Sequence, residues 1–233
     1  DPDNRYSIPY GWGVIGLLVR TDMAPGSITR WADLWDARYA GKVALWSDLP
    51  RETLALTLKS LGYSANSENP AELETALAKL IAFKPNIRFL NEFDPTSATP
   101  AMASGEIIAA MGYSGDFYES QELSLPVEYI FPKEGALLWN DNLITPANSP
   151  NKIGAELFIN FLLRPEIGAE LVNRNGYATS NDAAYEFIEE NILNNPIIFP
   201  KNEDLLNAEL ILPLSPQGQQ LYDEIWERFT AAP

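Results

Sequence analysis

Short apolar runs alternate with amphipathic segments through the first 131 residues of the chain. Runs of the length and composition of buried strands lie at residues 14–19, 43–46, 87–90, 107–111 and 127–131. Helical periodicity lies between them, at residues 27–35, 47–61, 69–83 and 100–104. This alternation predicts an α/β domain with a largely parallel sheet.

Several boundaries carry local signals. Asn69 is expected to cap the helix that follows it, with Glu72 in the capping-box position. Residues 6–10 contain a proline and are expected to form an edge or crossing strand. Gly11-Trp12-Gly13 is expected to be a flexible joint after that strand.

The pattern changes after residue 147. Helices are expected at residues 151–163, 165–173, 181–193 and 215–229, with almost no strand between them. A helical segment of this amphipathicity must bury its apolar faces against a partner.

Composition narrows the class of protein. At 233 residues and 46% hydrophobic, the chain can bury a sizeable core as one or two domains. The formal net charge of −16 argues against nucleic acid as a partner and is compatible with a cationic ligand, although acidity alone also favours solubility. The absence of cysteine and histidine excludes a Cys nucleophile, a Ser-His-Asp triad and a His- or Cys-ligated zinc site within this chain, and we expect no cofactor.

Polar and aromatic residues recur where the expected strands end. The segments concerned are residues 47–52, 93–97, 113–116 and 139–141. In α/β sheets, ligands bind outside the carboxyl ends of strands. An aromatic ring attracts a cation to its face, and a carboxylate accepts a charge-assisted hydrogen bond from it. The segments therefore favour an organic ammonium as ligand.

Trp139 and Asp141 form the sharpest of these pairs. In a strand, residues two apart point to the same face, so the indole and the carboxylate are expected side by side. A carboxylate next to a buried indole needs a partner, which favours a binding role for Asp141.

The other candidates also have structural interpretations. The alternatives are a helix-dipole partner for Glu52, a helix cap for Asp48 and Asp116, a core position for Tyr113 and Trp139, and a loop anchor for Tyr177.

A series of segments, in order over most of residues 6–184, forms a specific combination. They read YSIPYGWG, ITRWADLWDARYAGKVAL, LKSLGYSANSENPAELE, KPNIRF, SGEIIAAMGYSGD, FPKEGALLWND, ITPANSPNK, FINFLLRPEIGAELV and NGYATSNDAA. With them the chain resembles the spermidine/putrescine-binding family, the periplasmic polyamine-binding proteins of bacterial ABC importers.

The resemblance implies an α/β, periplasmic-binding-protein-like (type II) fold of two lobes, with the ligand in the cleft between them. Residue by residue, Trp139 and Asp141 match the W-x-D segment whose aspartate binds an ammonium group, and Tyr113 matches a cleft tryptophan. The remaining matches are Asp116 to an aspartate of putrescine-type members, Glu52 to a glutamate at the start of a helix, and Tyr177 to a cleft tyrosine. Leu49 stands where spermidine-type members carry a carboxylate, and Glu209 lies near the position of a late glutamine.

The family also carries a longer segment ahead of the position of Tyr6. We therefore expect a fragment or truncated chain, with residues 1–12 as a crossing strand, residues 13–135 as one complete lobe, and residues 136–233 as the helical return of an incomplete lobe. The resemblance implies an extracytoplasmic location, periplasmic or as a membrane-associated lipoprotein. The implied partners are a small cationic solute, such as a polyamine, and an ABC permease, and we expect self-association of the truncated chain.

Three alternatives remain open from sequence. Asp116, Asp141 and Glu52 can also be interpreted as the carboxylates of a glycoside hydrolase. The ligand can be a cationic solute other than a polyamine. The chain can also be an interaction module whose exposed helices pair with another chain.

Overall fold

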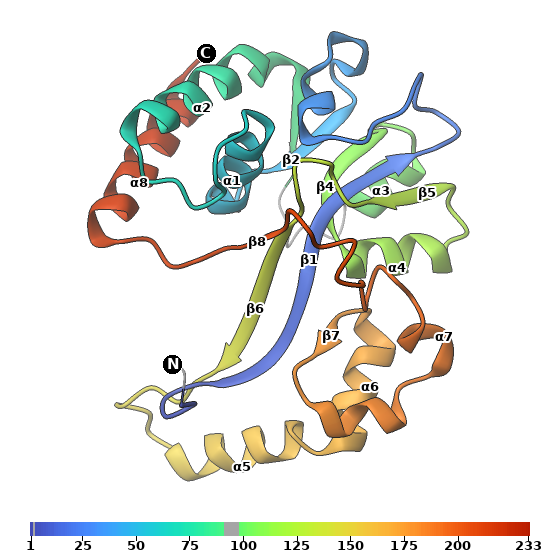
Figure 1. The fold of residues 1–233 in the computed structure, drawn as a ribbon, viewed down its shortest axis with the longest axis vertical. Coiled ribbons are helices and arrows are strands. Elements are labelled where there is room, and N and C mark those ends of the chain that lie inside the picture. The colour runs from blue at the N-terminus through green and yellow to red at the C-terminus, as the bar shows by residue number, and fades with distance from the viewer. Residues whose placement is uncertain (2, 91–97) are drawn as a thin grey trace. The chain divides into compact units, whose positions relative to one another are not determined.

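The structure, a computed structural model, describes residues 1, 3–90 and 98–233 (Figure 1). The chain forms two compact units: residues 1–14 and 138–201 make unit 1, and residues 15–137 and 202–233 make unit 2. The chain passes from one unit to the other after Val14, Leu137 and Lys201. Each unit is described below by itself.

The sheet of unit 2 is only partly parallel. Strand β2 (Val43–Trp46) pairs in parallel with β3 (Ile87–Leu90) and with β4 (Ala109–Tyr113). Strand β1 (Ile8–Arg20) pairs antiparallel with β4 and with β5 (Val127–Ile130). The expectation of a largely parallel sheet is therefore wrong for β1, whose direction depends on long-range pairing that local periodicity does not encode.

The helices of unit 2 follow from local start signals. Helix α1 (Pro50–Ser60) begins with a proline and has Glu52 in its first turn. Helix α2 (Pro70–Phe83) is capped as expected by the Asn69 side chain, which accepts a hydrogen bond of 2.9 Å from the Ala71 amide. The expected capping box is absent, since the Glu72 carboxylate accepts from the Ser67 hydroxyl. Helices α3 (Ala98–Ala103) and α4 (Ser114–Glu122) flank β4.

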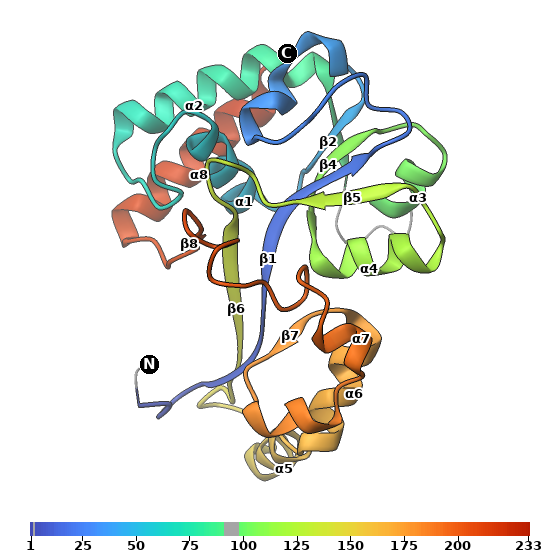
Figure 2. The ribbon, with the colours of Figure 1, turned by 45° about the vertical axis from the view of Figure 1, so that its right-hand side comes forward.

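The C-terminal helix α8 (Pro216–Ala231) packs against α2 in unit 2 (Figure 2). Its apolar side chains Tyr222, Ile225 and Phe229 are buried. Residues 202–233 thus differ from the expected division, which assigned all of residues 136–233 to the return of the incomplete lobe. Amphipathicity shows that a helix has a face to bury but does not show which neighbour covers it.

Two expected helices are shorter than predicted or have a different hydrogen-bonding pattern. Residues 27–35 form only a 3-10 helix, η1 (Trp31–Trp35), followed by η2 (Ala37–Tyr39). Residues 181–193 form η4 (Asp182–Phe187) and a short α7 (Glu190–Leu193) in place of one helix. Both predictions counted apolar residues at helical spacing over fewer than four turns, a length at which tertiary packing overrides local propensity.

Unit 1 combines strands with helices α5 (Lys152–Leu162) and α6 (Pro165–Asn175). Strand β6 (Leu137–Leu143) neighbours β1, and the short β7 (Ala178–Thr179) pairs antiparallel with β1 through Gly11 and Trp12. The two-residue strand β8 (Glu209–Leu210) belongs to unit 2. Residues 147–233 therefore contain very little strand among their described elements, as expected.

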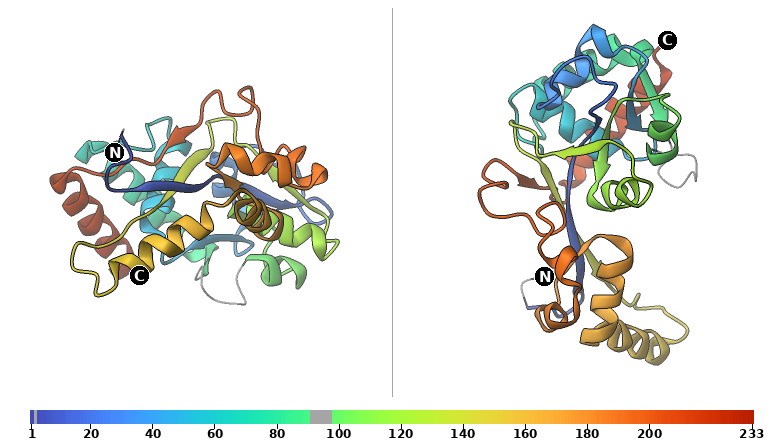
Figure 3. Two further views of the ribbon diagram at one scale, coloured as in Figure 1. Left: turned by 90° about the horizontal axis from the view of Figure 1, so that it is seen from below. Right: turned by 90° about the vertical axis from the view of Figure 1, so that its right-hand side faces the viewer.

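Strand β1 continues through the Gly11-Trp12-Gly13 segment without a break (Figure 3). The glycine at position 13 allows close packing. A Cβ atom at Gly13 would lie 2.6 Å from Cζ2 of Trp139, nearer than real Cβ contacts come. The indole of Trp139 therefore lies directly on the backbone of β1.

Helix α5 has no buried residue, although its sequence is strongly apolar on one face. Ile153, Leu157 and Phe158 are 74%, 64% and 60% exposed. A helix of this kind normally buries such a face, but the described residues leave the apolar face of α5 uncovered.

None of the helices in the described parts of the chain combines the length and the apolar character that a membrane crossing requires.

Candidate functional site

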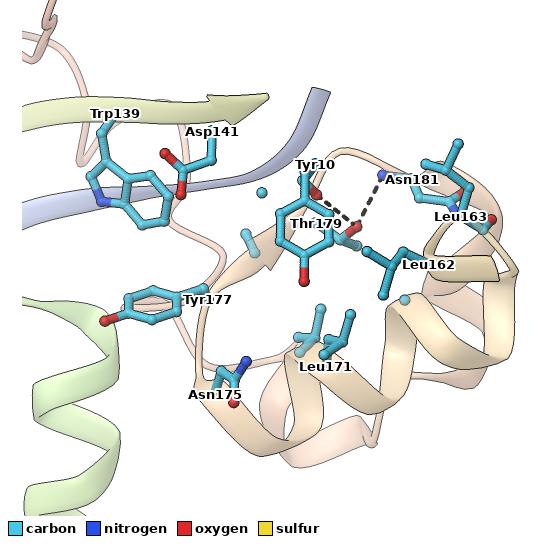
Figure 4. Close-up of a pocket in the computed structure, with 14 residues that line it drawn as sticks. Tyr10, Trp139, Asp141, Leu162, Leu163, Leu171, Asn175, Tyr177, Thr179 and Asn181 are labelled. Carbon is cyan, nitrogen blue, oxygen red and sulfur yellow. Dashed lines mark hydrogen bonds between the residues drawn. The ribbon is translucent and has the colours of Figure 1, made fainter. Parts of the chain in front are cut away.

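Three of the predicted site residues meet at one cavity in unit 1. Trp139 and Asp141 lie on β6, and Tyr177 lies between α6 and β7 (Figure 4). All three line a cavity of about 80 Å³ that is built wholly from residues of unit 1. The structure thus brings together the pair predicted from strand geometry and the more distant tyrosine.

Local geometry explains how the two aromatic rings meet. Gly176, with φ of 66°, ends α6 in the left-handed conformation and turns the chain towards β7. Tyr177 follows this turn, and its ring contacts the Trp139 indole edge-to-face, with centroids 5.3 Å apart and planes at 80°. This arrangement is a favourable one for aromatic pairs and holds both rings beside the cavity.

Asp141 carries the negative charge of the cavity. Among the described residues, no hydrogen bond or salt bridge engages its carboxylate. The residue is exposed overall, yet the loss of solvent around its carboxyl group raises its pKa above the ordinary aspartate range. A cation in the cavity would offset this cost by giving the carboxylate an opposite charge.

Tyr10 also lines this cavity and was not among the predicted site residues. It lies on β1, and its pKa is raised first by burial and then by the charge of Asp141. The sequence indicated only an aromatic residue in a crossing strand. Its place beside Asp141 follows from the pairing of β1 with β6, which no local pattern reveals.

Glu52, in unit 2, lies in the first turn of α1, directly after β2. It is half-buried, and burial raises its pKa, partly opposed by the helix's own amide and by Arg51. Glu52 therefore fits the interpretation as a negative charge that stabilises the N-terminus of α1. Its position after the carboxyl end of β2 is also compatible with ligand binding.

Tyr113 and Asp116 lie at the carboxyl end of β4, the parallel neighbour of β2. The Asp116 carboxylate accepts a hydrogen bond of 2.8 Å from the Tyr113 amide at the start of α4. Asp116 thus belongs to the capping box of α4, at its N3 position, whereas the N-cap residue is Tyr113. The remaining predicted segment at a strand end, residues 93–97, lies outside the described residues.

Glu209 lies close to the expected position of a late glutamine, but its carboxylate is bound by groups of the protein itself. Its carboxylate accepts a hydrogen bond from Lys59 at 2.7 Å and another from the Ala65 amide at 3.1 Å. Glu209 therefore fastens β8 to α1 within unit 2.

Comparisons with known proteins agree with the fold and with the resemblance in the sequence. A family model described as bacterial extracellular solute-binding protein matches residues 1–200. The spermidine/putrescine-binding periplasmic protein of Escherichia coli is 36% identical over 232 residues, covering 99% of this chain and 65% of that protein. The spermidine/putrescine-binding periplasmic protein 1 of Haemophilus influenzae is 31% identical, with 63% of that protein covered.

A solved structure gives the same result. A protein of Listeria monocytogenes described as a spermidine/putrescine ABC transporter is 33% identical and superimposes with a TM-score of 0.90, covering 99% of this chain and 70% of that one. The predicted fold class is confirmed by this likeness. The chain spans about 65% of the length of the Escherichia coli relative.

Proposed function

We propose a ligand class for this chain, which belongs to the family of bacterial extracellular solute-binding proteins. Its ligand is an organic ammonium of the polyamine type, the class that the names of its spermidine/putrescine-binding relatives indicate. The observation that carries the proposal is the Asp141 carboxylate, which has no protein partner among the described residues and lies beside Trp139 and Tyr177 at the cavity.

The physical case rests on two additive interactions. An ammonium group over an aromatic face gains roughly 0.5–2 kcal/mol, and most where water is excluded. A charge-assisted hydrogen bond to a carboxylate contributes about 1.5–3 kcal/mol. The proposal that one ligand makes both interactions is supported by the fact that Asp141 and the two rings line the same small cavity.

In unit 2, we infer that Glu52, Tyr113 and Asp116 serve as further ligand-binding residues. They stand at the carboxyl ends of the adjacent parallel strands β2 and β4, where α/β proteins bind ligands. A mutation of Asp116 would not separate ligand binding from stability, because its carboxylate also accepts a hydrogen bond from the Tyr113 amide at the start of α4.

The larger role we propose is that of the solute-binding component of a polyamine ABC importer, working outside the cytoplasm and delivering ligand to a membrane permease. The names of the relatives and the family description support this role. The family comprises solute-binding proteins, which does not favour the glycoside hydrolase alternative.

The test is calorimetric titration of the chain with putrescine and with spermidine. Asp141→Asn removes the charge at nearly constant size and should lower the affinity roughly tenfold to a hundredfold. Glu190→Gln is the matched control, because Glu190 is an exposed acid on α7 and does not line the cavity. Equal affinities for the wild type and Asp141→Asn would show that the ligand does not bind at Asp141.

A further inference from the structure

The indole of Trp139 lies against strand β1 at Gly13 (Figure 4). A Cβ atom at position 13 would lie 2.6 Å from Cζ2, 2.9 Å from Cε2 and 3.0 Å from Nε1 of this indole. These are the three atoms nearest to such a Cβ, and all belong to the same side chain. The space that a side chain at position 13 would need is therefore taken by the Trp139 ring.

The backbone itself does not require a glycine at position 13. Gly13 lies inside the unbroken strand β1, and its φ angle is not in the left-handed region, so an alanine could adopt the same backbone conformation. A glycine inside a strand also lowers stability, because it has more conformational freedom to lose on folding and packs no side chain. What glycine supplies at this position is room for the indole.

The position of the indole matters because Trp139 lines the cavity together with Asp141, two residues further along β6. Tyr177 contacts the same indole edge-to-face, with the ring centroids 5.3 Å apart. Gly13 itself does not line the cavity. A side chain at position 13 would therefore act on a ligand through the Trp139 ring, and not by contact with the ligand.

Even the smallest side chain would displace the Trp139 ring. Ordinary contacts of a Cβ atom begin at 3.4 Å, so an alanine at position 13 requires a separation of ring and strand that is about 0.8 Å larger. This shift exceeds the roughly 0.5 Å within which a binding site must hold its groups. A cation gains from an aromatic ring only when it lies over the ring face, so the displaced indole would contribute less to binding.

We propose that Gly13 is a positioning residue for ligand binding: its missing side chain seats the Trp139 indole where the ring meets a cation held by Asp141. The inference rests on the proposed function, because it requires a cation in this cavity. It adds to that function a residue that carries no functional group and lies outside the cavity lining.

The test is a double-mutant cycle of Gly13→Ala and Trp139→Phe, with the affinity for putrescine measured by calorimetric titration. Phenylalanine is smaller than tryptophan and leaves room for the added methyl group. Gly13→Ala should lower the affinity about tenfold in the wild-type background and less than about twofold in the Trp139→Phe background. Asp141→Asn should lower the affinity further when it is added to Gly13→Ala, because the carboxylate acts independently of the ring position.

Two results would overturn the inference. One is wild-type affinity in a folded Gly13→Ala variant. The other is an equal loss of affinity in both backgrounds, which would show that Gly13 does not act through the indole. If circular dichroism shows that Gly13→Ala does not fold, the double variant must fold and bind putrescine as Trp139→Phe does, and a double variant that also fails to fold overturns the inference.

The proposed function and the role of Gly13 fail in different ways. If Asp141→Asn weakens the binding of putrescine and Gly13→Ala does not, the proposed function stands and only the role of Gly13 is wrong. If Asp141→Asn leaves the affinity of the wild-type background unchanged, the proposed function fails, and the role of Gly13 fails with it.

Discussion

We expect the ion pair between Lys59 and Glu209 to be a main interaction that holds residues 202–233 against α1 in unit 2. Lys59 Nζ lies 2.7 Å from Glu209 Oε1 and also donates to the Asn207 carbonyl at 3.0 Å. The Lys59 side chain is only 7% exposed, and that of Glu209 is 29% exposed. Hydrogen bonds from Ser64 and the Ala65 amide complete the surroundings of the carboxylate.

The Glu209→Gln substitution keeps the shape of the side chain and removes its charge. Breaking a fully buried pair costs about 3–5 kcal/mol, because the remaining charge loses its partner. Glu209 is partly exposed, so solvent screens the pair, and Lys59 retains the Asn207 carbonyl. We therefore expect the free energy of unfolding of unit 2 to fall by about 2 kcal/mol.

Urea denaturation followed by circular dichroism measures this loss at neutral pH. The paired control is Lys59→Met with Glu209→Gln, which removes both charges, keeps an acceptor for the Ala65 amide and should cost less than Glu209→Gln alone. In the single variant the Lys59 charge remains and lacks its partner, whereas the double variant no longer has that charge. A double variant as unstable as the single one would therefore refute the reasoning. So would a loss below about 0.5 kcal/mol for Glu209→Gln, a value typical of an exposed pair.

The pH dependence supplies an independent check on the same pair. Burial acts to raise the pKa of Glu209, but the hydrogen bonds from Lys59 and Ser64 outweigh it, and the pKa is lowered. A carboxyl group with a lowered folded-state pKa stabilises the fold above its unfolded-state pKa and loses that contribution as the pH falls through the folded-state value. The difference in stability between the wild type and Glu209→Gln should therefore close on acidification.

Two further predictions concern unit 1. Because the pKa of Asp141 is raised, acidification should begin to lower the affinity for an ammonium ligand at a higher pH than it would with an ordinary aspartate. Titrations with the ligand across the acidic pH range test this, and the Asp141→Asn variant should show a flatter dependence of affinity on pH. The exposed apolar face of α5 should make the chain self-associate, and Leu157→Lys with Phe158→Lys should shift it towards monomer in analytical ultracentrifugation; an unchanged distribution would assign the association to another surface.

Local signals predicted well wherever the local chain decides the structure. Helices α1 and α2 begin where Pro50 and Asn69 indicate, because proline geometry and side-chain capping act within one turn. The direction of β1 and the neighbour of α8 were not predictable in this way, because both depend on contacts between residues far apart in the sequence.

The same division holds for the candidate site. Trp139 and Asp141 could be paired from the two-residue period of a strand, which is local. Tyr10 could not, because its place beside Asp141 requires β1 and β6 to be neighbours. The sequence predicts a flexible joint at residues 11–13, and it does not reveal that the missing side chain of Gly13 makes room for the Trp139 indole.

Acidity by itself does not identify the cation site in a chain with a formal net charge of −16. The hydrogen-bond partners of the carboxylates distinguish them better than their charge does. The Asp116 carboxylate accepts from the Tyr113 amide, and that of Glu209 accepts from Lys59. The Glu134 carboxylate accepts from the Trp31 and Ala32 amides. Each of these charges already has a donor within the protein. The Asp141 carboxylate has none among the described residues, lines a cavity together with aromatic rings, and has a pKa that burial raises. Under the proposed function, a cation in the cavity would be the partner of this carboxylate, and the rings beside it would contribute to binding that cation.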